Sequence, residues 1–207
     1  MEAIDLYGMS PEDVVKYLPM KDCGGCGKKD CKEFASALSE GTSEIKECPE
    51  IGLKMKSSLE GSLSIRLVVR EADESMEAVP DPLIPVNGPS SDSPVLLTGN
   101  SAVTLWVLKM IFDKSPEVSA WILPTDTKGF TVDHVMPMNL MTPMAVSKAI
   151  LLSGIANKVR SKTLIIPGLC EGLEHKIESI TRWKVVVGPR SGFELPAYLT
   201  RLADGHE

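Results

Sequence analysis

The sequence lacks the features that mark several broad classes of protein. Its 22 basic and 28 acidic residues give a net charge of −6, so the composition carries no basic footprint for nucleic acid. No apolar run approaches the roughly 18–20 residues that cross a bilayer. The start of the chain, Met-Glu-Ala-Ile-Asp, lacks the basic region of a signal peptide. We therefore expect a soluble cytoplasmic protein that binds neither nucleic acid nor membrane.

The sequence also lacks the common nucleotide-binding motifs. No Gly-x-Gly-x-x-Gly follows the first strand-like segment, and no P-loop is present. Dinucleotide and ATP chemistry therefore lack their usual signatures, and the sequence does not favour a free-standing enzyme of that kind.

Cysteine is nearly absent from the second half of the chain, and this uneven distribution divides the sequence. Four of the five cysteines precede residue 50, whereas the long apolar runs follow residue 94. Residues 71–94 are acidic and rich in Pro, Ser, Gly and Asp, which is typical of a linker. We predict a cysteine module at residues 1–60, a strand from Ser62 to Val68 and the linker within residues 61–91, and a larger domain at residues 92–207.

Local signals predict two helices in the cysteine module. Ser10-Pro11-Glu12-Asp13 is typical of a helix start, because serine caps the first turn and acidic residues favour its positive end. A second helix is expected from about Asp30 to Leu38, ended by Gly41.

The larger domain alternates short apolar segments with helix-like segments. Such alternation predicts an α/β fold with a Rossmann-like parallel sheet, right-handed crossovers and flanking helices. Ligands in sheets of this kind lie beyond the carboxyl ends of the strands. The expected strands are residues 95–97, 121–123, 163–166 and 184–187, and the expected helices are residues 102–112, 142–153 and 173–180.

The four clustered cysteines have the spacing C-x2-C-x4-C-x16-C and are Cys23, Cys26, Cys31 and Cys48. Glycines between them let the loop wrap tightly, and a helix beginning at Cys31 would stabilise an anionic group. We interpret the pattern as a [4Fe–4S] site. Structural zinc, which also takes four cysteines, is the alternative, although only one C-x2-C pair is present. The isolated Cys170 is typical of a small buried apolar residue.

The cysteine motif, followed by Phe34-Ala35 and Leu38, resembles the iron–sulfur domain of the large subunit of corrinoid iron–sulfur proteins. This is the gamma subunit of acetyl-CoA decarbonylase/synthase. Four later segments resemble the cobalamin-binding domain at the C-terminus of that subunit: residues 93–100, 126–129, 164–168 and 186–190. Both matches occur in the family's order, but a short linker stands where the family has a TIM barrel.

The resemblance implies a methyl carrier of anaerobic one-carbon metabolism. In this family cobalt(I) takes a methyl group from a methylated pterin and passes it to acetyl-CoA synthase, and the cluster donates the electron that reactivates oxidised cobalt. The chain would then be a component of a methyltransferase system rather than a stand-alone enzyme. Its partners would be a methyltransferase, the small subunit of the corrinoid protein or the acetyl-CoA synthase complex. The alternative is an accessory electron-transfer or assembly protein that no longer binds a corrinoid.

The candidate corrinoid residues lie at the expected strand ends. They are Thr98, Gly99, Asn100, Thr125, Thr127, Gly129, Thr131, His134, Gly168, Gly188 and Arg190. An ordinary helix cap is the alternative role for the first three. His134 is either an axial cobalt ligand or a loop residue, and a neighbouring Asp133 would tune its imidazole.

Overall fold

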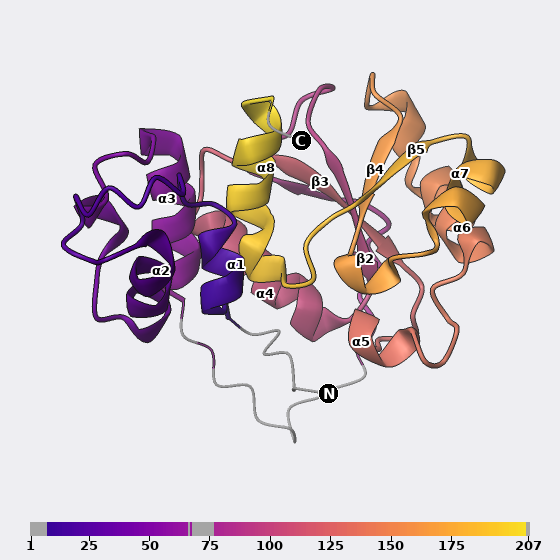
Figure 1. The fold of residues 1–207 in the computed structure, drawn as a ribbon. Helices are drawn as coiled ribbons and strands as arrows, with labels where there is room; N and C mark the ends of the chain where they lie inside the picture. Colours follow the sequence, from indigo (N-terminus) through magenta and orange to yellow (C-terminus); the bar gives the residue numbers. More distant parts are fainter. Residues whose placement is uncertain (1–7, 66, 68–76, 206–207) are drawn as a thin grey trace. The chain divides into compact units, whose positions relative to one another are not determined.

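The computed structural model describes residues 8–65, 67 and 77–205, which form two compact units (Figure 1). Unit 1 contains the described residues up to position 67 together with Asp113–Val118 and residues 191–205. Unit 2 contains residues 77–112 and Ser119–Arg190. These units differ from the expected division at residue 92, because two later segments belong with the cysteine module.

Unit 2 is built around a mostly parallel sheet, as the sequence predicted. Its described strands are β1 (Ile84–Val86), β2 (Val95–Gly99), β3 (Ala120–Thr125), β4 (Thr163–Ile166) and β5 (Lys184–Val187). They lie in the order β1-β3-β2-β4-β5, with β1 antiparallel and the others parallel. In the register, Val95 lies opposite both Trp121 and Leu164. The carboxyl ends of β2, β3, β4 and β5 therefore share one edge of the sheet.

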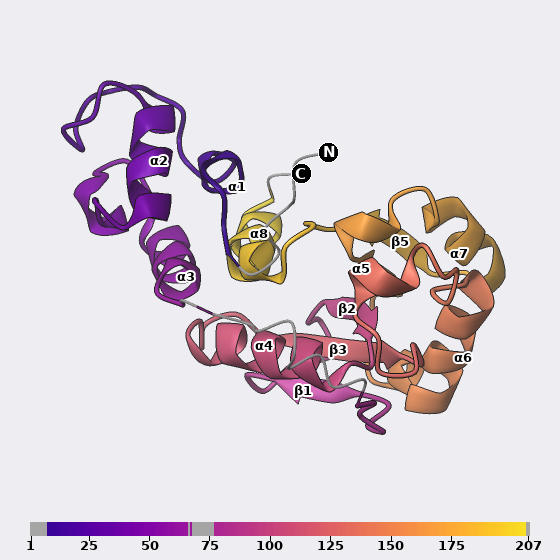
Figure 2. The same cartoon turned by 90° about the horizontal axis from the view of Figure 1, so that it is seen from below.

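Helices cover the two faces of this sheet (Figures 1 and 2). The connection from β2 to β3 and the connection from β3 to β4 run in opposite directions across the sheet. Because both are right-handed crossovers, their helices lie on opposite faces. On one face, Leu97, Leu123 and Leu164 pack with Val146 and Ile177 of the helices. The helices of unit 2 are α4 (Ala102–Asp113), α5 (Val132–Val135), α6 (Pro143–Ser153) and α7 (Glu174–Thr181), with short 3-10 turns η3 (Ile155–Asn157) and η4 (Gly168–Cys170).

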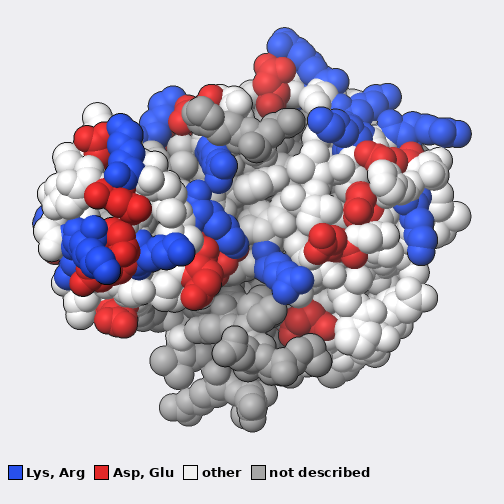
Figure 3. Space-filling view, in the orientation of Figure 1, with Lys and Arg blue, Asp and Glu red and all other residues white. Residues whose placement is uncertain are grey.

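Unit 1 is helical in its described residues. Its elements are α1 (Pro11–Val15), α2 (Cys31–Glu40), η1 (Ile45–Glu47), α3 (Leu53–Leu63), η5 (Gly192–Glu194) and α8 (Leu195–Ala203). The two predicted helix signals are confirmed: Ser10 forms a capping box with Asp13, and Gly41 ends α2 in a left-handed conformation with φ 74°. Figure 3 shows basic and acidic side chains interspersed over this unit.

The predicted strand from Ser62 to Val68 is wrong at its start, because Ser62 and Leu63 are the last residues of α3. Helix α3 packs against α8, and Ser58 and Thr200 share a buried hydrogen bond of 2.8 Å. This packing overrides the alternating pattern. Residues 66 and 68 of that prediction lie outside the described residues. The described part of the expected linker, residues 77–91, contains β1.

Among the described residues, none of the helices combines the length and the hydrophobicity that crossing a bilayer requires.

Candidate functional site

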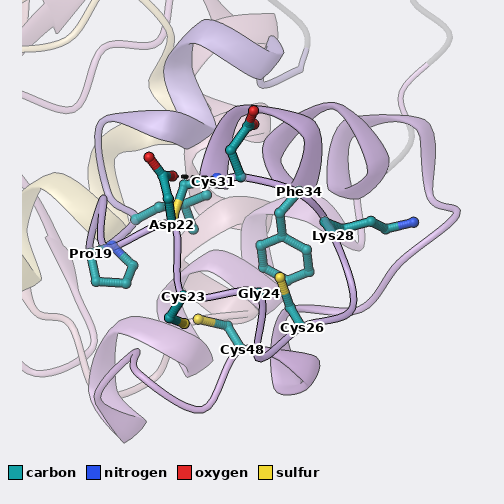
Figure 4. A pocket seen from close by; sticks show the side chains of 11 residues that line it. Pro19, Asp22, Cys23, Gly24, Cys26, Lys28, Cys31, Phe34 and Cys48 are labelled. Carbon is teal, nitrogen blue, oxygen red and sulfur yellow. Dashed lines mark hydrogen bonds between the residues drawn. The ribbon is translucent and has the colours of Figure 1, made fainter.

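Cys23, Cys26, Cys31 and Cys48 line one cavity in unit 1 (Figure 4). Cys23 and Cys26 belong to the loop that leads into α2, Cys31 is the first residue of α2, and Cys48 follows η1. The rest of the wall includes the apolar side chains Leu18, Pro19 and Phe34. Four thiols around one largely apolar cavity are a donor set that fits a cuboidal iron–sulfur cluster.

Close backbone contacts shape the cysteine loop. The Gly27 amide donates to the Gly24 carbonyl over 2.9 Å, and both glycines have left-handed φ values of 76° and 68°. A Cβ atom on Gly25 would lie 2.8 Å from Cγ of Pro49 and 3.5 Å from Sγ of Cys23. The loop can therefore pack onto the segment that carries Cys48 only with glycine at position 25.

Asp22 anchors the loop to the start of α2. Its Oδ1 accepts a hydrogen bond of 2.8 Å from the Cys31 amide, while Asp30 caps the helix by accepting 2.8 Å from the Glu33 amide. Asp22 was not among the residues predicted from the sequence. Its position directly before Cys23 was only a weak indication of this role, because the Cys31 amide that it accepts from is nine residues away.

The electrostatic setting of the cavity suits an anionic group. Cys31 is the first residue of α2, so its thiol lies at the positive end of the helix dipole. Cys31 and Cys48 are buried and Cys26 is half-buried, whereas Cys23 is exposed. The Cys23 side of the cavity therefore faces solvent. Among residues 8–65, 67 and 77–205, no three His, Cys, Asp or Glu side chains converge closely enough to hold a single metal ion.

Unit 1 also buries an acidic side chain. Glu194 is 1% exposed, and its Oε2 accepts hydrogen bonds from the Tyr17 hydroxyl at 3.0 Å and from Lys16 Nζ at 3.1 Å. Its Oε1 is buried without a hydrogen-bond partner. Burial and the nearby charge of Asp13 hold the pKa of the Glu194 carboxyl above its ordinary value, against the opposing effects of Lys16 and Tyr17.

The strand-end residues of unit 2 divide into buried and accessible ones. Thr98, Thr125 and Thr127 are buried, so their hydroxyls face the protein interior. Asn100 is half-buried, and its Oδ1 accepts a hydrogen bond from the Thr127 amide. Gly99 and Gly129 complete this pair of adjacent loops. The structure therefore brings the predicted residues of β2 and β3 together, but it turns the three threonine side chains inward.

His134 is the third residue of the short helix α5, whose N-cap is Thr131. The His134 side chain is exposed, and its Nδ1 lies 2.8 Å from the Thr131 hydroxyl and 3.3 Å from the Asp133 carboxylate. These neighbours occupy one ring nitrogen, which leaves Nε2 as the nitrogen for an external partner.

The loops after β4 and β5 are joined to each other. The Gly168 amide donates to the Pro189 carbonyl over 2.9 Å, and the Gly188 amide donates to the Ile166 carbonyl over 2.8 Å. A Cβ atom on Gly168 would lie 2.8 Å from the Gly188 oxygen. Gly168 therefore serves close backbone packing, whereas Arg190 is exposed.

Cys170 is fully buried and stands apart from the other cysteines, as its sequence context predicted. Its Sγ lies 3.6 Å from the sulfur of Met136, and burial raises the pKa of its thiol to about 12. It is a neutral core residue.

Comparison with known proteins decides the family. Residues 63–199, well over half of the chain, match the family model described as CO dehydrogenase/acetyl-CoA synthase delta subunit. The chain belongs to this family. Residues 18–50 match a second model, described as "Putative Fe-S cluster", and this segment contains all four clustered cysteines. The second match supports an iron–sulfur cofactor.

The curated relatives confirm the resemblance seen in the sequence. The gamma subunit of the acetyl-CoA decarbonylase/synthase complex of Methanothermobacter thermautotrophicus is 39% identical over 112 residues, covering 54% of this chain and 24% of the relative. The same subunit of Methanocaldococcus jannaschii is 31% identical, covering 66% and 28%. The corrinoid/iron-sulfur protein large subunit of Moorella thermoacetica is 27% identical, covering 58% and 27%. The chain spans about a quarter of the length of these relatives.

Proposed function

We propose that unit 1 holds a [4Fe–4S] cluster on Cys23, Cys26, Cys31 and Cys48 and uses it for electron transfer. The observation that carries this proposal is the single cavity lined by all four thiols at the start of α2. A bound cluster supplies one-electron chemistry. The protein's part is to hold the thiolates, to bring the positive end of α2 to the anionic group and to leave the Cys23 side open to an electron donor.

We further propose that unit 2 binds a corrinoid at the carboxyl ends of its parallel strands. The names of the relatives and the position of ligand sites in such sheets support this assignment. A bound corrinoid supplies cobalt as the carrier of a methyl group. Of the predicted residues, Thr131, His134 and Arg190 are accessible enough to contact it. The buried Thr98, Thr125 and Thr127 are not.

The two sites together support the role of a corrinoid iron–sulfur methyl carrier in the cytoplasm. The cluster would donate the electron that keeps cobalt reduced, and the chain would act with a methyltransferase, a corrinoid-protein small subunit or an acetyl-CoA synthase complex. The relatives are named as subunits of the acetyl-CoA decarbonylase/synthase complex. The chain would then be one component of a methyltransferase system.

Two measurements on anaerobically purified full-length protein test these assignments separately. Iron and acid-labile sulfide should each approach about four per chain, whereas stoichiometric zinc without sulfide would contradict the cluster. Titration with hydroxocobalamin should shift the visible bands of the corrinoid. A protein that contains the cluster but leaves these bands unchanged, with and without acetyl-CoA synthase present, would be the accessory electron-transfer or assembly protein instead.

A further inference from the structure

The side chain of Asn100 joins the loop after β2 to the loop after β3. Its Oδ1 accepts hydrogen bonds from the Thr127 amide at 3.0 Å and from the Gly129 amide at 3.1 Å. The Thr127 hydroxyl lies 3.0 Å from the same oxygen. Backbone groups 27 and 29 residues further along the chain therefore converge on one side-chain atom. Buried amides need such acceptors, because leaving them unpaired is costly.

Thr127 completes the junction from the other side. Its side chain is fully buried, and its hydroxyl lies 2.7 Å from the Phe130 carbonyl and 3.2 Å from the Asn100 amide. Since a hydroxyl carries one proton, the shorter contact indicates that it donates to the Phe130 oxygen and accepts from the Asn100 amide. The loop is thus closed onto itself and onto the end of β2.

Glycine at position 99 permits this close approach. A Cβ atom there would lie 2.8 Å from Oγ1 of Thr127 and 3.0 Å from the Phe130 carbonyl. The loop also contains Lys128 in a left-handed conformation, with φ 59°. An isolated loop would not favour that backbone, so the contacts from Asn100 and Thr127 hold it in place.

We propose that Asn100 and Thr127 are positioning residues for the ligand site of unit 2 and do not contact the ligand. They hold residues 126–130, and this loop leads directly into the N-cap Thr131 and the exposed His134. This inference rests on the proposed corrinoid site. In this proposal the accessible side chains at the end of the loop contact the corrinoid. The only side-chain atom of Asn100 that the site requires is its Oδ1.

The proposal predicts different outcomes for two substitutions at position 100. Asn100→Asp retains an oxygen acceptor for the Thr127 and Gly129 amides and replaces only the amide NH2 group, for which no hydrogen bond is described. Asn100→Ala removes the acceptor. A positioning role tolerates aspartate and fails with alanine, whereas a ligand contact through the NH2 group fails with both.

Thr127→Ser keeps the hydroxyl, and Thr127→Val removes it at nearly constant volume. Asn157→Asp, an exposed change on η3, controls for the added charge.

The experiment measures two quantities on the full-length protein. The first is hydrogen exchange of the Thr127 and Gly129 amides without cobalamin, and the second is the affinity for hydroxocobalamin. We expect Asn100→Ala and Thr127→Val to speed exchange and weaken binding by roughly tenfold or more. Asn100→Asp, Thr127→Ser and Asn157→Asp should stay within about threefold of the parent protein.

Three outcomes decide the inference. Loss of binding in Asn100→Asp with slow amide exchange retained would overturn it, because the NH2 group would then contact the ligand. Unchanged exchange in Asn100→Ala would overturn it as well, because the loop would not depend on the side chain. If the parent protein binds no hydroxocobalamin, the proposed corrinoid function fails, and the exchange rates still decide whether Asn100 and Thr127 hold the loop.

Discussion

Gly61 leaves no room for a single added methyl group in unit 1. It lies in α3, and a Cβ atom there would sit 2.6 Å from the Lys114 carbonyl and 2.8 Å from Oγ of Ser115. The carbonyl belongs to the backbone, so it cannot rotate away as a long side chain would. Gly61→Ala therefore has to move α3 or residues 113–118 by several tenths of an ångström.

Two opposing effects set the magnitude of this change. Alanine in a helix interior is favoured over glycine by about 0.5–1 kcal/mol. Overpacking of a close contact costs about 1–3 kcal/mol. We expect the contact to dominate and to lower the free energy of unfolding of unit 1 by about 1–2 kcal/mol. For a domain of this size, the midpoint temperature should fall by roughly 5–10 °C.

The two units can be followed separately in the holoprotein. All three tryptophans, Trp106, Trp121 and Trp183, belong to unit 2, so their fluorescence reports its unfolding. Loss of the visible absorbance of the proposed cluster would report the unfolding of unit 1. Gly61→Ala should shift the absorbance transition and leave the fluorescence transition in place. Ser57→Ala, on the exposed side of α3, should shift neither by more than about 0.5 kcal/mol. An unchanged or raised absorbance midpoint in Gly61→Ala would refute the claim that this contact is rigid.

Three further outcomes are expected. The pKa of Glu194 is raised in the folded protein, so ionisation of this carboxyl lowers the free energy of unfolding. The loss is absent below the pKa of the unfolded state and is complete once pH has risen through the pKa of the folded state. Glu194→Gln should therefore gain thermal stability relative to the parent as pH rises above the ordinary pKa of a glutamate carboxyl. A loss would show that the bonds to Lys16 and Tyr17 dominate. Cys26→Ser should lose iron and sulfide and should speed hydrogen exchange throughout unit 1, including α8. The control Cys170→Ser should keep its iron and sulfide. If His134 reaches cobalt, electron paramagnetic resonance of the cobalt(II) form should show nitrogen splitting that disappears in His134→Ala; identical spectra would exclude this ligand.

Features that depend on neighbouring residues could be predicted from the sequence. The capping box of Ser10 and the left-handed end of α2 at Gly41 are local. So are the apolar runs of β2, β3 and β4, because a strand buried on both faces needs a continuous apolar segment. The alternation of these strands with helices was sufficient for the parallel sheet. The set of four cysteines was also visible, because its short spacings and glycines lie within a single stretch of the chain.

Only the tertiary structure decided which distant segments meet. Helix α8 belongs to unit 1 because Thr200 bonds to Ser58 and the small residues of α3 allow close packing, and neither fact is visible in either segment alone. The same packing made Ser62 and Leu63 helical, although their alternating pattern predicted a strand. Thr127 was a candidate corrinoid residue from its place at a strand end, and only the tertiary structure showed that it lies buried against Asn100. Such contacts depend on how the chain folds back on itself, and the local preferences of the residues involved do not specify their partners.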